Sequence, residues 1–156
     1  MQPSRFDELA FFRELHHSGA RAVLIGRRAL VLLGLPVLTA DYDFWIGIDD
    51  IAAFNAVAGR FDLRPTSTPD EARRTGRYVL ENDEHVDVLV ARALSTAGGQ
   101  SIEFDAIWAR RQSVPLDNVE VMVPSIDDLI LTKQVAARPK DVEDIRLLRI
   151  LKDERS

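Results

Sequence analysis

The chain contains no cysteine. A disulfide framework, a metal site built from thiolates and a cysteine nucleophile are therefore all excluded. The first residues, MQPSRFDELAFF, lack the basic and then apolar profile of a signal peptide, and no uncharged apolar run approaches the length that crosses a membrane. We therefore expect a soluble cytoplasmic protein without a membrane partner.

An excess of basic residues is also missing. The formal net charge of −5 argues against a broad surface that coats nucleic acid, although it is compatible with a local basic groove. Gly98 and Gly99 are not followed by a strand-to-helix switch with further spaced glycines, so a dinucleotide-binding fingerprint is absent. With 156 residues, 46% of them hydrophobic, the sequence predicts one compact globular domain spanning residues 1–156.

The segment 23–48, VLIGRRALVLLGLPVLTADYDFWIGI, predicts a strand, a turn, a short helix, a loop and a second strand. Asp41 and Asp43 stand where the second strand begins, separated by Tyr42. Because successive side chains of a strand point to opposite faces, both carboxylates project one way, about 6 to 7 Å apart. Each carboxylate raises the pKa of the other, and an oxygen-seeking divalent cation relieves this repulsion. The alternative is a pair of exposed acids at the end of a strand.

Gly26 follows the apolar run of residues 22–25 and opens the short helix. The backbone N–H groups of Arg27 and Arg28 then point outward at a helix N-terminus, where phosphate binds well. A phosphate turn and a pair of carboxylates for Mg²⁺ are the parts that a nucleotidyl-transfer site needs, because catalysis there is mostly positioning and charge neutralisation.

This arrangement resembles the DNA polymerase beta-like nucleotidyltransferase superfamily, in which a glycine pair or Gly-Ser follows a strand, then comes a helix, and D-x-D opens a second strand. The version here, IGRRALVLLGLPVLTADYDFWIG, is most similar to the minimal bacterial AbiEii-type nucleotidyltransferases. Those proteins are often toxins of toxin–antitoxin pairs and favour a T-x-D-x-D ending, here Thr39, Asp41 and Asp43. The chain departs from the pattern at Arg27, where the family usually has Gly or Ser.

A third acid lies in the predicted strand H-V-D-V-L-V, residues 85–90. Val86 and Val88 face one side of this strand, whereas His85 and Asp87 face the other. An acid within an apolar strand is costly unless it has a partner. The resemblance implies one, since active members carry a third carboxylate that contacts the metal or deprotonates the acceptor hydroxyl. We therefore expect Asp87 to complete the site, with a structural Asp87 as the alternative, and we interpret His85 as an exposed strand-end residue.

Ser125 begins another predicted helix with capping-box-like spacing. Its apolar face is expected to hold Ile126, Leu129, Ile130, Ala136 and Ala137. Lys133 falls in the middle of this face and must either snorkel to water or meet an anion. Residues 125–144 are similar to the C-terminal signature of the AbiEii-type family, S-x-D-D-L-I-x-x-K-x-x-A-x-R-x-K-D-x-x-D, where the lysine approaches the nucleotide phosphates. The resemblance thus implies that Lys133 holds phosphate.

The remaining patterns complete an α/β (α+β) fold, a nucleotidyltransferase-type mixed β-sheet flanked by α-helices. They predict a first helix capped by Ser4, a loop over 64–75, strands over 78–80 and 85–90, a hairpin formed by 113–116 and 119–123, and a final helix that buries Val142, Ile145, Leu148 and Leu151. Arg73, Arg74 and Arg77 are open to two interpretations, a solvated patch or a clamp for phosphate or acceptor.

The resemblance implies transfer of a nucleoside monophosphate from an NTP to an acceptor hydroxyl. The residues that it implies are Asp41, Asp43 and Asp87 for Mg²⁺ or Mn²⁺, and Gly26, the Arg27 backbone and Lys133 for phosphates. The acceptor is left open between RNA such as tRNA, a protein and a small molecule. The surface that binds the acceptor is left open between a groove of this chain, a homodimer interface and another protein. An antitoxin protein is a further implied partner. The rival hypothesis is a non-catalytic nucleotide-binding or partner-regulating module, because a bulky Arg27 either adds a phosphate contact or fills the pocket.

Overall fold

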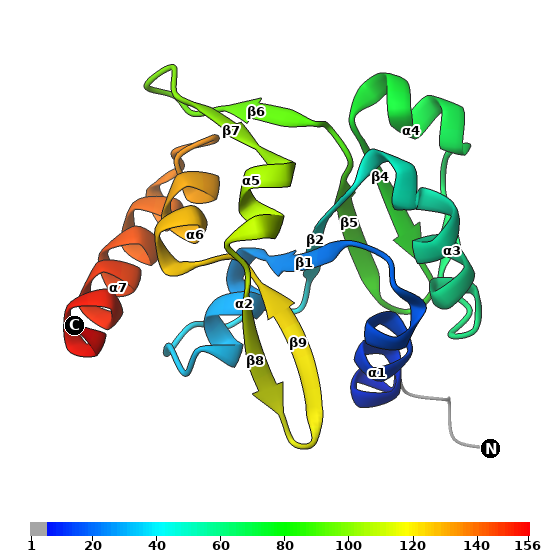
Figure 1. Ribbon diagram of the computed structural model, residues 1–156, viewed down its shortest axis with the longest axis horizontal. Helices are drawn as coiled ribbons and strands as arrows, with labels where there is room; N and C mark the ends of the chain where they lie inside the picture. Colours follow the sequence, from blue (N-terminus) through cyan, green and yellow to red (C-terminus); the bar gives the residue numbers. More distant parts are fainter. Residues whose placement is uncertain (1–5) are drawn as a thin grey trace.

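The computed structural model describes residues 6–156 and is built around a mixed five-stranded sheet (Figure 1). Its strands are β1 (Ala22–Ile25), β2 (Tyr42–Ile46), β3 (Arg64–Pro65), β4 (Arg77–Glu81) and β5 (His85–Leu89), in the order β1-β2-β5-β4-β3. The central pair β2 and β5 is parallel, and the other neighbouring strands are antiparallel. Two small ribbons accompany the sheet, β6 (Ala93–Ser95) with β7 (Ser101–Glu103) and β8 (Gln112–Leu116) with β9 (Val119–Val123).

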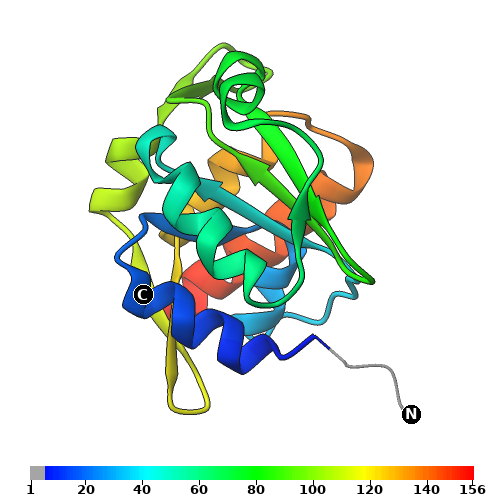
Figure 2. The same cartoon turned by 90° about the vertical axis from the view of Figure 1, so that its right-hand side faces the viewer.

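Helices flank the sheet on both sides, which confirms the predicted mixed α/β architecture (Figures 1 and 2). They are α1 (Glu8–Ser18), α2 (Gly26–Leu32), α3 (Ile51–Gly59), which follows a short 3₁₀ turn η1 (Ile48–Asp50), α4 (Pro69–Thr75), α5 (Phe104–Ala109), α6 (Ile126–Lys133) and α7 (Pro139–Arg155). In Figure 2, α1 and α3 lie in front of the strands, and α6 and α7 lie behind them.

One face of the sheet is closed by α1 and α3. Phe44 of β2 points to this side and packs its ring against Phe11 of α1 and Phe54 of α3, with ring centroids 5.9 Å and 5.3 Å apart. Val86 and Val88 of β5 belong to the same buried cluster. Because side chains alternate along a strand, the residues between these must face the other way.

The opposite face is covered over only part of its area. Val23, Ile25 and Trp45 form a second buried cluster with Ile102 of β7 and with two residues of α5, Phe104 and Ile107. Asp43 and Asp87 share this face with Trp45, by the alternation of the strands. Both aspartates are only half-buried. The uncovered remainder of this face is therefore where functional side chains can meet a ligand.

Several predicted elements are confirmed. The unit of strand, helix, loop and strand appears as β1, α2 and β2, and the strand that carries Asp87 appears as β5, paired with β4. The predicted hairpin is β8 and β9, which reverses at Asp117 with a φ of 53°. Ser125 caps α6 by accepting a hydrogen bond from the Asp128 backbone N–H.

The predicted loop over 64–75 is wrong, because this segment contains β3 and α4. Helix α4 begins with Pro69, which suits the first helical position, and Thr68 and Glu71 form a capping box. Only Ala72 of this helix is buried, so the hydrophobic periodicity that normally indicates a helix is absent.

Other boundaries also differ from the sequence expectation. Asp7 caps α1 by accepting from the Ala10 N–H, and the predicted cap at Ser4 lies outside the described residues. Helix α6 ends at Lys133, so Ala136 and Ala137 do not continue its apolar face. Val142 is exposed on α7, because this helix packs through Ile145 and Leu148 instead.

None of the helices in the described part combines the length and the apolar character of a membrane-spanning segment.

Candidate active site

A cleft of about 520 Å³ opens where the second face of the sheet is uncovered. Strands β2 and β5 form its floor, the turn before α2 forms one side, and the end of α6 with the start of α7 forms another. The structure brings all six residues that the sequence singles out into this cleft, namely Gly26, Arg27, Asp41, Asp43, Asp87 and Lys133. Residues more than a hundred positions apart thus line a single cavity.

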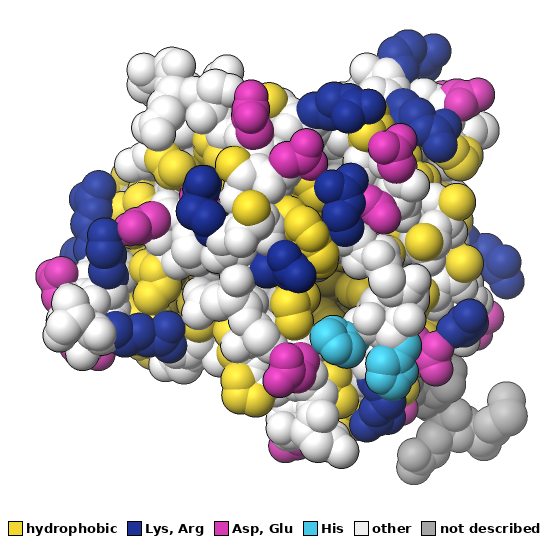
Figure 3. Space-filling view, viewed as in Figure 1, with side chains coloured by type: hydrophobic (Ala, Val, Ile, Leu, Met, Phe, Trp, Pro, Cys, Tyr) yellow, Lys and Arg dark blue, Asp and Glu magenta, His cyan; other side chains and the backbone are white. Residues whose placement is uncertain are grey.

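A second, smaller hollow of about 210 Å³ has a different character. It lies between α1, α5 and β9, and Figure 3 shows its apolar floor next to the histidine side chains. Its polar lining consists of His16, Arg111 and Glu120, so it brings no pair of carboxylates together. The 520 Å³ cleft, which brings the predicted carboxylates together with basic side chains, is therefore the candidate active site.

The carboxylates are positioned by strand register. In the parallel pair of β2 and β5, Asp43 lies directly beside Asp87. Asp41 immediately precedes β2, and its backbone N–H donates to Thr39 Oγ1 at 3.1 Å. Three acidic side chains from two neighbouring strands and one adjoining loop therefore meet at the same end of the cleft.

Arg28 holds the loop that carries Asp41. Its Nε donates to the Asp41 carbonyl at 3.3 Å, and its guanidinium lies 4.2 Å from the ring centroid of Tyr42. A hydrogen bond to the Thr39 carbonyl adds a second tie to the same loop. Arg28 thus fixes the position of a cleft residue without lining the cleft itself.

The glycine at the turn leaves room for a carboxylate. Gly26 has a φ of +69°, a conformation that residues with a Cβ rarely adopt. A Cβ at this position would lie 2.5 Å from Asp43 Oδ2 and 3.1 Å from Asp43 Cβ. Both the backbone conformation and the closeness of Asp43 therefore require glycine here.

At the acidic end of the cleft, negative charge outweighs the positive charge that reaches Asp43. Burial, together with the carboxylates of Asp87 and Asp41, raises the pKa of Asp43 to about 6, against the opposing effect of Lys133 and Lys140. Within residues 6–156, no group of three or more histidine, cysteine, aspartate or glutamate side chains is arranged to hold a metal ion by itself. The hard oxygen donors suit Mg²⁺, which commonly binds one or two carboxylates together with substrate phosphates. The residues present therefore fit a cation that takes its remaining ligands from a bound phosphate group.

A pH-dependent stability follows from the raised pKa of Asp43. Its folded pKa of about 6 lies above the ordinary value of 3.8, so the stability that protonated Asp43 contributes is complete below about pH 4 and is lost as the pH rises through 6. We expect Asp43→Asn to unfold at about the same urea concentration as the wild type at pH 4, and to be more stable by about 1 to 3 kcal/mol at pH 7.5. The exposed Asp49→Asn controls for the loss of one charge. A stability difference that does not change with pH would contradict the raised pKa.

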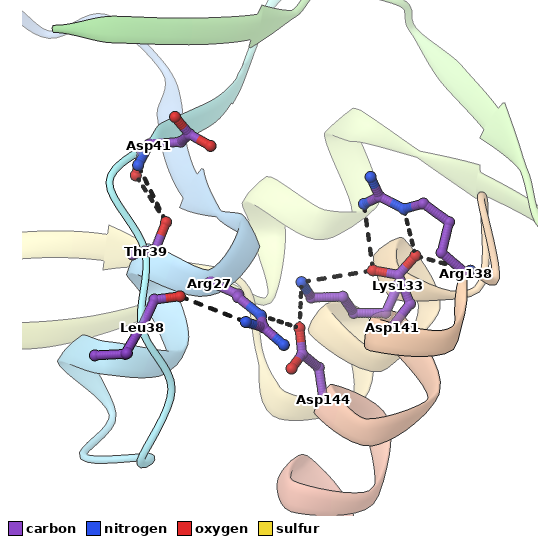
Figure 4. Close-up of polar contacts among 8 residues, drawn as sticks. All are labelled: Arg27, Leu38, Thr39, Asp41, Lys133, Arg138, Asp141 and Asp144. Atoms are coloured by element: carbon purple, nitrogen blue, oxygen red, sulfur yellow. Dashed lines mark hydrogen bonds and ion pairs between the residues drawn. The ribbon is translucent and has the colours of Figure 1, made fainter.

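Basic side chains form the other side of the cleft (Figure 4). Lys133, only 7% exposed, places its Nζ 2.9 Å from Asp144 Oδ2 and 3.8 Å from Asp141 Oδ1. Arg138 Nε lies 2.9 Å from Asp141 Oδ2. The anion that Lys133 meets in this structure is therefore a carboxylate of the chain itself, and Lys133 does not snorkel to water.

The side chain of Arg27 joins the same group. Its Nε donates to Asp144 Oδ2 at 3.2 Å, and its Nη1 donates to the Leu38 carbonyl at 3.4 Å. The guanidinium is thus held at the wall of the cleft, next to Lys133 (Figure 4). Asp144 itself does not line the cleft and has no exposed side-chain surface.

Some cleft residues were not assigned to the site from the sequence. Arg138, Lys140 and Asp141 line it, and the only sequence signal was their place in the R-x-K-D-x-x-D part of the C-terminal signature. Of the three arginines left open, Arg77 lines the cleft. Arg73 pairs with Asp70 on the surface of α4, and Arg74 is exposed on the same helix.

His85 contacts Asp87 at the rim. Its Nε2 lies 3.3 Å from Asp87 Oδ2, and its Nδ1 lies 3.5 Å from Glu81 Oε1. The ring is about half exposed and does not line the cleft. The expected position at an exposed strand end is confirmed, with the addition of this contact.

Solved structures with the same fold include the following two. One is the crystal structure of TM1012 from Thermotoga maritima, titled as a candidate nucleotidyltransferase, with a TM-score of 0.61 and 16% identity over 87% of this chain and 86% of that chain. The other is the solution structure of the antibiotic-resistance factor ANT(2'')-Ia, with a TM-score of 0.64 and 14% identity over 93% of this chain and 86% of that chain. At such identities the likeness establishes the fold alone. Among curated proteins, a sequence search finds no match.

A family model covers almost the whole chain. It is described as "Nucleotidyltransferase of unknown function (DUF6036)" and matches residues 8–153, which include every residue of the cleft. The chain therefore belongs to this nucleotidyltransferase family.

Proposed function

We propose that the protein, acting as a single nucleotidyltransferase domain, transfers a nucleoside monophosphate from an NTP to an acceptor hydroxyl with Mg²⁺ or Mn²⁺. The observation that carries this proposal is the division of one cleft into an acidic end and a basic wall. Asp41, Asp43 and Asp87 form the acidic end, and Lys133 belongs to the basic wall. A nucleoside triphosphate with its divalent cation has the complementary charges, since its phosphates need cations and its metal needs carboxylates.

In this proposal Asp41 and Asp43 hold the cation, and Asp87 completes its site or accepts the proton of the acceptor hydroxyl. When bound, the cation neutralises charge on the phosphates. The Gly26 turn, the Arg27 backbone and Lys133 hold the triphosphate. The acceptor oxygen forms a bond to the α-phosphorus, the bond from that phosphorus to the bridging oxygen breaks, and pyrophosphate leaves with the electron pair. The hydroxyl proton passes to the Asp87 carboxylate.

The direct test is a transfer assay with Mg²⁺ and each α-labelled NTP against total tRNA, total cell protein, an aminoglycoside and the protein itself. We expect label on one of these acceptors and none with the Asp41→Asn, Asp43→Asn double variant. If the wild type binds NTP but labels no acceptor, the non-catalytic nucleotide-binding module is the better description. If it binds no NTP under any of these conditions, the proposed function is wrong.

The resemblance to AbiEii-type proteins adds a biological proposal, that the protein is the toxin of a toxin–antitoxin pair with an antitoxin protein as its partner. Its support is the T-x-D-x-D ending at Asp43 and the signature that contains Lys133. Expression of the chain alone should then arrest growth, and co-expression of a small neighbouring gene product should restore it. Unimpaired growth with detectable transfer activity would separate the enzyme from the toxin role.

The role of Lys133 can be separated from its ion pair. A hydrogen bond from a charged group contributes about 1.5 to 3 kcal/mol, so Lys133→Met should weaken NTP binding by about that amount in calorimetry. The variant also leaves Asp144 buried with one counterion fewer, so the fold should lose stability.

Combining Lys133→Met with Asp144→Asn removes the buried carboxylate and should restore the unfolding temperature, whereas NTP binding should stay weak. If the double variant recovers NTP affinity together with stability, Lys133 is only a structural residue.

A further inference from the structure

Arg27 occupies the position where the similar nucleotidyltransferases have a small residue, and its side chain has a defined place. The guanidinium uses Nε for Asp144 and Nη1 for the Leu38 carbonyl, and 29% of the side chain remains exposed in the cleft. A guanidinium has five N–H donors in a rigid fork, so Nη2 and the second hydrogen of Nη1 are left for another acceptor. The side chain is therefore held in place while part of its hydrogen-bonding capacity faces the cleft.

The carboxylate that holds Arg27 has an uneven environment. Lys133 and Arg27 both contact Asp144 Oδ2, at 2.9 Å and 3.2 Å. The other oxygen, Oδ1, is buried and has no hydrogen-bond partner among the described residues. An ion pair inside a protein is stabilising only when its remaining hydrogen-bonding groups are satisfied, so this arrangement is not the one expected of a purely structural pair. Instead, Asp144 brings the Arg27 guanidinium and the Lys133 ammonium group together at one point.

On the basic wall by itself the charges do not balance, and the carboxylates of Asp41, Asp43 and Asp87 that would offset them lie at the opposite end of the cleft, where the proposed cation binds. Arg27, Lys133, Arg138 and Lys140 contribute four positive charges on this side of the cleft, whereas Asp141 and Asp144 contribute two negative charges. Cations brought together at partly buried positions repel one another unless an anion lies between them. A polyanion with several phosphate groups supplies the missing charge, and a single phosphate supplies less of it.

We propose that the Arg27 side chain is a ligand of the β- or γ-phosphate, held at the cleft by Asp144 as a positioning residue. This inference rests on the proposed function for the choice of a nucleoside triphosphate. It also explains why an arginine is accommodated at the phosphate turn, since the guanidinium is drawn to the wall beside Lys133 rather than left over Gly26. We therefore expect affinity to rise with the number of phosphates, so that triphosphates bind far better than monophosphates.

The test compares three probes by calorimetry in Mg²⁺, namely inorganic tripolyphosphate, ATP and AMP. We expect Arg27→Ser to weaken binding of tripolyphosphate and ATP by about 10- to 100-fold, the effect of losing a charge-assisted hydrogen bond, and to leave AMP binding within about twofold. Arg27→Lys keeps the positive charge but loses the forked donors of the guanidinium. Its affinity for tripolyphosphate and ATP should therefore lie between those of the wild type and Arg27→Ser. Arg146→Ala removes an exposed arginine on the outer side of α7, where it pairs with Glu143, and is the matched control.

The positioning role of Asp144 predicts non-additivity. If Asp144 orients the guanidinium, Arg27→Ser should cause a smaller loss of ATP affinity in an Asp144→Asn background than in the wild-type background, by at least about threefold. A structural Asp144 would leave that loss unchanged. Should Asp144→Asn fail to fold, the intermediate affinity of Arg27→Lys still tests the need for the fork.

The outcomes distinguish this inference from the proposed function. If the wild type transfers nucleotide but Arg27→Ser binds tripolyphosphate and ATP as the wild type does, the inference is wrong and the function stands. If tripolyphosphate binding depends on Arg27 but no acceptor is labelled, the inference stands and the transfer function is wrong. If the wild type binds neither polyphosphate, both are wrong.

Discussion

Asp87→Asn should bind NTP and Mg²⁺ nearly as the wild type does, yet transfer nucleotide at least about 100-fold more slowly. General-base assistance is typically worth about 10²- to 10⁴-fold, and it acts in the transition state rather than in ground-state binding. Asparagine has nearly the shape of aspartate but neither accepts the hydroxyl proton nor carries the charge for a cation. The measurement is single-turnover transfer together with calorimetric NTP affinity, because only the pair of values separates chemistry from binding.

The stability of this variant distinguishes a functional acid from a structural one. Asp87 raises the pKa of its neighbour Asp43, so the two carboxylates repel each other in the free protein. Neutralising Asp87 removes that repulsion, and the melting temperature should hold or rise. A structural Asp87 predicts the reverse, a clear loss of stability with activity retained.

His85 provides the matched control for that experiment. It contacts Asp87 at 3.3 Å but lies half exposed at the rim, outside the cleft. We expect His85→Ala to keep transfer activity within a few-fold of the wild type, since its contact with Asp87 is exposed to water. An equal loss in His85→Ala and Asp87→Asn would instead place the histidine in the proton path.

The parts of the fold that the sequence predicts correctly are those with a local signal. The buried run that forms β1, the glycine at its end and the alternation in β5 each act over a few residues. The acidic part of the candidate site could be predicted from the same features. Strand alternation places Asp43 on one face of β2 and Asp87 on one face of β5, and the register of the two strands then sets them side by side.

The wrong predictions, a loop over 64–75 and a buried Val142, also have physical reasons. Helix α4 is held by its capping box and buries only Ala72, so it lacks an apolar stripe. Val142 continues the apolar spacing of α7, yet no element within residues 6–156 packs over that side, and the residue is exposed. Apolar spacing shows which residues are able to pack, whereas their burial depends on which neighbour the fold supplies.

The basic wall of the cleft could be predicted only in part. The position of Lys133 on an apolar face required an anion or a route to water, and nothing local distinguished Asp144 from a phosphate. The contact of Arg27 with Asp144 joins residues 117 positions apart, so it depends on the packing of α2 against α6 and of α6 against α7. Such a pairing has no counterpart in sequence spacing.

The second large effect is expected at the phosphate turn. Gly26→Ala should reduce nucleotide transfer at least about 100-fold while the protein still folds. The new Cβ would lie 2.5 Å from Asp43 Oδ2 and 3.1 Å from Asp43 Cβ, so the carboxylate must turn away. Displacing a reacting or metal-holding group by about 1 Å is sufficient for a loss of about 10²-fold.

Gly34→Ala is the matched control for this substitution. Gly34 has a φ of +88°, close to the +69° of Gly26, but a Cβ there would meet no atom within 4 Å. Both variants should therefore lose about 1 to 2 kcal/mol of unfolding free energy from backbone strain alone, measured by urea denaturation. Only Gly26→Ala should also lose the Mg²⁺ dependence of its NTP affinity, because only that variant moves Asp43. If both alanine variants retain the same transfer rate, the close approach of Gly26 and Asp43 has no part in the reaction, and the turn before α2 is a feature of the fold rather than of the site.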